Sequence, residues 1–301
     1  MTIYAVSLIS TTGYPFANKQ LKEEPTEIPL KLLFYEYGGK SKWNDKTVFD
    51  ENTAFELNAG LIAALSEFAR LLRRPITGLL FKYAGQSELP DNYKPESIVM
   101  DNFSENDIGT IITVRCDIYN HYLEVKKKVD LIFENYVKKY TPFGPDKIFE
   151  RESLNNIIRI LSDQAAKEKL LKYADQIRNS SLNFIEEMNS YGVESIMITS
   201  CDFTPLVTFG DLSLAEGEEM LRNLGDVPLV DTFDWKYRQS RFMRGTTEKR
   251  VWTFIINSGA GVTVDGQFQP YYYMLICAPG SFLGEVPQRY YSLINKIFLD
   301  E

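Results

Sequence analysis

The sequence predicts an α+β protein with two domains, each a roughly five-stranded antiparallel sheet flanked by helices. Its 301 residues give room for about two domains. Apolar runs rich in β-branched and aromatic residues often follow one another directly, which favours antiparallel pairing. A hairpin pattern also occurs twice, 190 positions apart, so that Ser10 coincides with Ser200 and Pro15 with Pro205. The chain is therefore expected to use one kind of hairpin-led unit twice.

Composition and charge describe a folded, acidic protein. Hydrophobic residues make up 44% of the chain and charged residues 25%, so both halves can bury a core. The net charge of −8 argues against general nucleic-acid binding, which needs a basic surface. The first residues lack the pattern of a signal peptide, and no apolar run approaches the roughly 18 residues of a membrane span. Three scattered cysteines, Cys116, Cys201 and Cys277, are typical of buried thiols. We therefore expect a cytoplasmic protein.

The first half predicts the element order ββαβββα. Its longest helix follows from Leu61, Leu65, Phe68 and Leu72, which recur at steps of three and four residues, and Pro75 ends it. The predicted strands are 3–9, 30–37, 76–83, 98–100 and 108–116, and the predicted helices are 52–73 and 119–139.

The second half predicts the order αββαβββα. It begins after the break at residues 141–145, which contain two prolines and a glycine. The predicted helices are 152–191, whose continuity stays open with 179–181 as the candidate break, then 213–224 and 286–299. The predicted strands are 193–199, 205–209, 229–235, 250–256 and 271–278, with a basic loop at 237–249.

The hairpin of the second half is the clearest single motif. Val193, Ile196 and Ile198 form an apolar run, a polar turn contains Asp202, and Pro205 opens a second apolar run. β-branched residues favour an extended chain, and Asp and Pro favour the turn between two strands.

Two stretches resemble known domain families. Residues 182–188, followed by Gly192–Ile198 and Pro205–Val207, resemble the start of a roadblock domain. Ile3–Val6 with Gly13–Pro15 resembles the opening of a longin domain. The chain departs from these patterns at Phe203, where a glycine is common, and in a long loop at 38–50. The resemblance implies a longin-like domain at 1–145 and a roadblock-like domain at 146–301.

Longin and roadblock domains are mostly non-catalytic platforms, and the resemblance implies a function of that kind. We expect a scaffold or regulator that binds a small Ras-like GTPase or other longin or roadblock proteins, in trafficking or signalling assemblies. The resemblance also implies homo- or heterodimers, no bound cofactor or metal, and membrane association only through partners.

The candidate partner-binding residues are basic and aromatic. They are Lys236, Arg238, Arg241, Phe242 and Arg244, followed by Lys249 and Arg250. On an acidic chain such a segment is suited to an acidic partner, an anionic lipid or a phosphate group. A solvated loop explains the same residues equally well, because charge runs usually face water.

Other motifs favour structural interpretations. Gly38–Ser41 resembles the end of a phosphate loop, but Phe34 stands where the first glycine is needed. The glycines at 259–261 are not followed by a helix, so they indicate a hairpin loop. Residues 126–128 are three lysines, expected to solvate the outer face of a helix.

Two other classes of function remain open. A small-molecule sensor with a PAS- or profilin-like fold would hold its ligand in a pocket inside one unit. An enzyme is disfavoured, because the single histidine, His121, lies five positions after Cys116 and nothing identifies a third group to orient its ring. Buried carboxylates, or Cys116 beside His121, in a cleft would favour an enzyme.

Overall fold

The computed structural model describes residues 2–10, 15–25, 28, 30–37, 110–141, 143, 147–225, 227 and 229–299. The chain divides into two units, residues 1–37 with 110–301 and residues 38–109, and every described residue belongs to the first. The sequence predictions at 38–50, 52–73, 76–83 and 98–100, together with the Gly38–Ser41 motif, lie outside the described residues.

The described strands form two antiparallel sheets, which confirms the α+β class. The four-stranded sheet has the order β2-β1-β4-β3, and its strands are β1 (Ile3–Ser10), β2 (Pro15–Gln20), β3 (Leu30–Tyr37) and β4 (Thr110–Asp117). The five-stranded sheet has the order β6-β5-β9-β8-β7, and its strands are β5 (Val193–Thr199), β6 (Pro205–Gly210), β7 (Trp235–Arg244), β8 (Thr247–Val264) and β9 (Gln267–Cys277).

Six α-helices accompany these sheets among the described residues. They are α2 (Tyr122–Ile132), α3 (Arg151–Leu161), α4 (Gln164–Lys172), α5 (Ala174–Met188), α6 (Leu214–Asn223) and α7 (Val286–Leu299). A π-helical turn at Phe133–Val137 and a 3₁₀ turn at Lys138–Tyr140 continue α2 and complete the helix predicted at 119–139.

The long helix predicted at 152–191 is three helices. The first break falls at Asp163, whose φ of 56° is left-handed and cannot continue a helix. The second falls at Tyr173, between α4 and α5. The candidate break at 179–181 is not one of them, because these residues lie inside α5.

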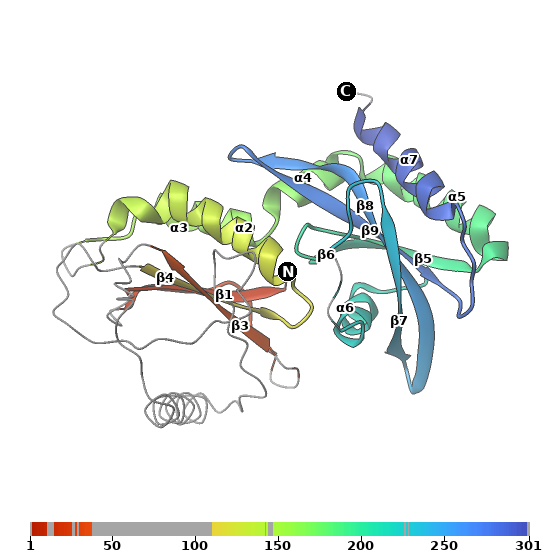
Figure 1. Ribbon diagram of the computed structural model, residues 1–301, viewed down its shortest axis with the longest axis horizontal. Coiled ribbons are helices and arrows are strands. Elements are labelled where there is room, and N and C mark those ends of the chain that lie inside the picture. The colour runs from red at the N-terminus through yellow and green to blue at the C-terminus, as the bar shows by residue number, and fades with distance from the viewer. Residues whose placement is uncertain are drawn as a thin grey trace, which may run out of the picture. The chain divides into compact units, whose positions relative to one another are not determined.

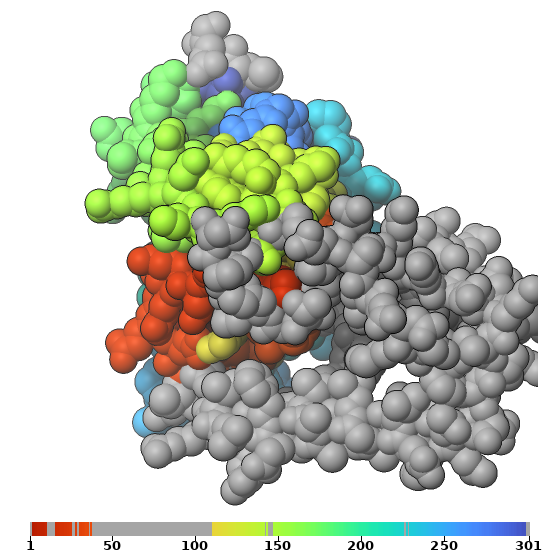
Figure 2. All heavy atoms as spheres, turned by 90° about the vertical axis from the view of Figure 1, so that its left-hand side faces the viewer, coloured from red at the N-terminus to blue at the C-terminus, as the bar shows by residue number. Residues whose placement is uncertain are grey.

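Each sheet is covered by named helices. On the five-stranded sheet, α5 and α7 pack on one face and α6 packs on the other (Figure 1). On the four-stranded sheet, apolar side chains of α2 and α3 join one core with β1, β3 and β4. Figure 2 shows these two helices, in yellow-green, next to the first strands, in red. The proposed domain boundary near residue 145 stays a prediction, although α3 contributes to the first core.

The predictions for residues 229–249 are wrong. The expected strand at 229–235 and basic loop at 237–249 are replaced by β7, a ten-residue strand that pairs with β8 from Trp235↔Ile256 to Arg244↔Thr247. The glycines at 259–261 lie within β8, at a register shift, and the turn follows at Asp265–Gly266.

The pairing of the strands confirms the internal repeat. In the first hairpin Leu8 pairs with Ala17, and the register then shifts so that Ile9 pairs with Pro15. In the second, Ile198 pairs with Val207, and the shift brings Thr199 opposite Pro205. A second shift lies between Ile3 and Ala5 of β1, and its counterpart lies between Val193 and Ser195 of β5. All these positions correspond at the same offset of 190 residues.

Candidate functional site

Strand β7 forms one edge of the five-stranded sheet, with β8 as its neighbour. An edge strand presents main-chain N–H and C=O groups to solvent, and these can pair with another chain. The five candidate residues from the sequence all lie on this strand. The structure therefore places them on an ordered edge.

The four basic candidates are side chains on two faces of β7. In a strand, successive side chains point to opposite faces, so Lys236, Arg238 and Arg244 share one face and Arg241 lies on the other. Each makes a local hydrogen bond: Lys236 Nζ to Leu229 O (3.1 Å), Arg238 Nη1 to Tyr237 O (3.0 Å), Arg241 Nη1 to Glu248 Oε2 (3.0 Å) and Arg244 Nε to Glu216 Oε1 (3.0 Å).

Phe242 lies in the core. Its side chain is only 2% exposed and belongs to the apolar cluster between α6 and the sheet, together with Met220 and Ile255. Phe242 therefore supports β7 from inside and offers almost no surface of its own to a partner.

The face of β7 opposite α6 carries aromatic side chains. The ring of Tyr237 stacks on Trp252 of β8 with 5.5 Å between centroids, and Trp235 contacts Phe254 at 5.5 Å. Tyr237 remains 50% exposed. The edge thus combines an aromatic face, a basic face and accessible backbone.

Helix α6 occupies one end of the edge. Asn223 Nδ2 donates to Arg241 O at 3.0 Å, and Met243 N donates to Glu219 Oε1 at 3.1 Å. In an antiparallel ladder the N–H and C=O of one residue point to the same side, and this side alternates along the strand. The main-chain N–H and C=O of Gln239 therefore also point away from β8. They find no partner among the described residues.

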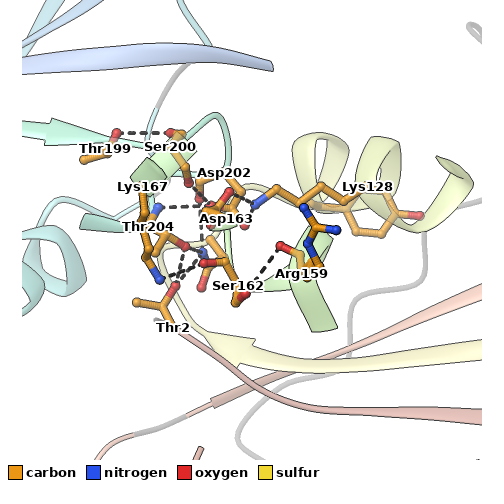
Figure 3. A network of polar contacts seen from close by, with 12 residues as sticks. Thr2, Lys128, Arg159, Ser162, Asp163, Lys167, Thr199, Ser200, Asp202 and Thr204 are labelled. Carbon is orange, nitrogen blue, oxygen red and sulfur yellow. Dashed lines mark hydrogen bonds and ion pairs between the residues drawn. The ribbon is translucent and has the colours of Figure 1, made fainter. Parts of the chain in front are cut away.

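A second polar site is a buried ionic cluster formed by Lys128, Asp163 and Asp202 (Figure 3). Lys128 Nζ donates to Asp163 Oδ1 at 2.6 Å and to Asp202 Oδ2 at 2.7 Å. All three side chains are at most 1% exposed. The cluster joins α2, the corner between α3 and α4, and the turn between β5 and β6.

The two carboxylates differ in their surroundings. Burial raises the pKa of Asp163 to about 6, although Lys128 opposes the shift, and Asp163 Oδ2 makes no hydrogen bond within the described part of the chain. Burial also acts to raise the pKa of Asp202. Lys128, the Ser200 hydroxyl and Thr204 nevertheless hold that pKa below its ordinary value. Burial acts to lower the pKa of Lys128, but the flanking carboxylates outweigh it and raise this pKa, so the side chain stays protonated.

Neutral hydrogen bonds extend the cluster to the start of the chain. Asn120 Nδ2 donates to Thr2 Oγ1 at 3.0 Å and to Asp202 O at 3.1 Å. The hydroxyls of Thr2 and Thr204 lie 2.7 Å apart. These contacts stabilise the turn that carries Asp202, so the cluster has the geometry of a structural clamp.

The surroundings of the cysteines and of His121 are largely apolar. Cys116 and Cys201 are buried, and burial raises the pKa of both thiols. The ring of His121 lies edge-on to Phe203, with 6.2 Å between centroids. Among the described residues, no group of three His, Cys, Asp or Glu side chains is placed to hold a metal ion.

A small cleft lies beside the ionic cluster. It has a volume of about 110 Å³ and is lined by residues of α3, α4, the corner between them and the β8–β9 hairpin, among them Arg159, Asp163 and Gln269. Tyr136 and Asp265 border it and share a hydrogen bond of 2.6 Å. A second groove, of about 450 Å³, is lined by residues of α5 and α7.

No protein-family model matches this sequence, and no curated protein matches it significantly. Within the described ranges, no helix is both long and apolar enough to span a membrane.

The ionic cluster was not predicted from the sequence. The prediction that residues 126–128 solvate an outer helix face is wrong for Lys128, which is fully buried. One signal was present, because Lys128 follows Val125 by three positions and precedes Ile132 by four, which places it on the apolar face of the helix. Its partners Asp163 and Asp202 carried no local signal.

Proposed function

We propose that this chain is a non-catalytic scaffold or regulator that binds a small Ras-like GTPase or another longin or roadblock protein. The observation that carries the proposal is the edge of β7, where a basic face, an aromatic face and outward-pointing backbone groups lie together. Edges of this kind bind partners by adding a strand.

The element order of the second half supports the roadblock part of the proposal. Helix α5, the β5–β6 hairpin, α6, three strands and α7 follow one another. This is the order of roadblock domains, in which a leading helix, a hairpin, a helix, three strands and a closing helix follow one another. The matching hairpin in β1 and β2 supports a related, longin-like first half.

The test is a direct binding measurement. The purified chain is titrated with small GTPases of its host, each loaded with GDP or with a non-hydrolysable GTP analogue, and hydrolysis is followed in parallel. We expect one GTPase to bind, with affinity reduced by R238E/R241E. The control variant R289E changes an exposed residue of α7, outside β7. If no GTPase binds in either nucleotide state, the proposal is wrong.

The alternative function is a small-molecule sensor, and the cleft beside Asp163 is its candidate site. Asp163 Oδ2 and Gln269 Nε2 have no hydrogen-bond partner within the described residues, so a small polar molecule could satisfy both. The volume of about 110 Å³ is below the roughly 300–1,000 Å³ of common ligand pockets. A small molecule retained in native mass spectrometry would favour this alternative.

A further inference from the structure

We propose that the open part of the β7 edge binds an extended acidic segment of a partner, in which acidic and apolar side chains alternate. This inference rests on the proposed function, since it names the chemistry of the partner. Three features of β7 support the inference: the accessible backbone, the two faces of the strand and the local charge.

The accessible backbone is short and well defined. Glu219 and Asn223 of α6 already bond to Met243 N and Arg241 O, so they take the place of a neighbouring strand there. Towards the other end the outward-pointing groups of Gln239 remain available. The partner strand would pair beside residues 236–240, where it would replace the contact of 3.0 Å from Arg238 Nη1 to Tyr237 O.

The two faces of β7 define the side chains that fit. A residue opposite Tyr237 would point to the aromatic face, where Tyr237 stacks on Trp252. Its neighbours would point to the other face, where Lys236 and Arg238 are exposed. Because side chains alternate in any strand, acids are expected at every second position and apolar residues between them.

The local charge selects an acidic partner over a second copy of this chain. The β7–β8 hairpin from residue 235 to residue 250 contains six basic residues and one acid, Glu248, in a chain of net charge −8. Two copies paired through β7 would bring two such hairpins together. Like charges on neighbouring strands are destabilising, and lysine or arginine on an edge is a common barrier to self-association.

The probe is a labelled peptide, acetyl-VEVEVEV-amide, titrated against the full chain and followed by fluorescence anisotropy. One control peptide is VVVVEEE, which has the same composition without alternation, and the other is VKVKVKV. We expect the alternating acidic peptide to bind at least tenfold more tightly than either control. Binding should weaken as salt is raised, because exposed charges are screened.

Two variants separate backbone pairing from charge. Gln239→Pro removes an outward N–H, and proline is tolerated on the solvent side of an edge strand. Arg238→Glu reverses a charge on the basic face. Both should reduce peptide affinity at least tenfold, whereas R289E on α7 should leave it unchanged; far-ultraviolet circular dichroism and thermal unfolding check that each variant is folded.

Several outcomes would overturn the inference. These are equal binding of the three peptides, binding unaffected by Q239P, capture of the chain by phosphatidylserine vesicles without peptide binding, or a dimer that Q239P dissociates. Peptide binding that Q239P abolishes supports the inference even if no GTPase binds. GTPase binding without peptide binding leaves the proposed function in place and rejects this partner chemistry.

Discussion

Lys128 and Asp202 are 74 positions apart in the sequence, and the Lys128 ammonium donates to Asp202 Oδ2 over 2.7 Å. The same ammonium binds Asp163 at 2.6 Å, so one cation neutralises two buried carboxylates that come from different elements. Burying charges is costly unless they are paired and hydrogen-bonded. The contact therefore fixes the β5–β6 turn to α2 with high geometric specificity.

Replacing Lys128 by methionine should destabilise the protein strongly. Two buried carboxylates would lose their cation, and breaking a buried ion pair in this way costs about 3–5 kcal/mol. The matched control is Lys126→Met, since Lys126 is a partly exposed neighbour that pairs with Asp130 within one helix. The control should lose at most about 1 kcal/mol. Urea unfolding at pH 7 measures both, and equal losses would contradict the role given to Lys128.

The pH dependence of stability should reveal Asp163. Its folded-state pKa, about 6, lies above its ordinary value of 3.8, so the folded protein binds this proton more tightly than the unfolded chain does. Between these two values the free energy of unfolding contributed by Asp163 therefore falls as pH rises. Asp202 has the opposite shift, and its contribution is present above its ordinary pKa and lost as pH falls through its lowered value.

Asp163→Asn isolates the first of these effects. Asparagine tolerates the left-handed backbone at this position, so the corner between α3 and α4 can persist. The stability advantage of the native chain over D163N should shrink between pH 4.5 and pH 7. Urea unfolding at several pH values measures it. An advantage that grows with pH would show that attraction to Lys128 outweighs the burial of Asp163.

The hairpins could be predicted because their information is local. Val193, Ile196 and Ile198 form a buried strand, Pro205 opens the next one, and the same pattern recurs 190 positions earlier with the same register shifts. Such features depend on neighbouring residues and on the period of a strand.

Features that depend on distant contacts could not be predicted. Strand β7 lacks the regular alternation of a half-buried strand, because Lys236 and Arg238 are exposed on the face where Ser240 and Phe242 are buried. Phe242 shares a core with α6 while Lys236 and Arg238 stay exposed, so apolar and polar residues do not alternate regularly along the strand. Likewise, Asp163 ends α3 in a left-handed conformation, and the sequence around it keeps a helical pattern.

Arg222 should be irreplaceable by lysine at its contact with Asp117. Its guanidinium donates twice to Asp117 Oδ2, at 3.0 Å from Nε and 2.8 Å from Nη2, and the Asp117 side chain is fully buried. Burial raises the pKa of Asp117, although Arg222 opposes the shift. A lysine cannot reproduce this planar fork. We expect R222K to lose about 1–3 kcal/mol and R222M to lose more, in urea unfolding against the exposed-site control R289K. A fully stable R222K would contradict the bidentate contact.

Gly261 should tolerate no side chain. A Cβ there would lie 2.1 Å from Gln269 O, a main-chain atom of the paired strand β9 that cannot rotate away. G261A is expected to cost about 1–3 kcal/mol through overpacking. Gly266, in the β8–β9 turn, has open space where a Cβ would lie but a φ of 84°. G266A should therefore cost about 1–2 kcal/mol from backbone strain alone. Hydrogen exchange measures both variants, and only G261A should lose protection of the amides that pair β8 with β9. Unchanged protection in G261A would contradict the clash.

Substitutions of Phe242 and Tyr237 should have different effects on stability and on peptide binding, because the two residues lie on the same strand but on opposite faces. Phe242 is 2% exposed and Tyr237 is 50% exposed. F242A should cost about 3–5 kcal/mol, as expected for a large buried aromatic side chain. At temperatures where the variant remains folded, its affinity for the alternating acidic peptide should stay within twofold of the native value.

Y237A should behave in the opposite way. It removes the stacking on Trp252, which is worth about 0.5–1.5 kcal/mol, so the loss of stability is small. Its affinity for the peptide should fall at least fivefold, because the apolar positions of the incoming strand would lose the ring on which they pack. Thermal unfolding and fluorescence anisotropy on the same samples measure the two quantities. If F242A lost affinity while folded and Y237A did not, the partner would contact the α6 side of β7, and the face assigned to its apolar residues would be wrong.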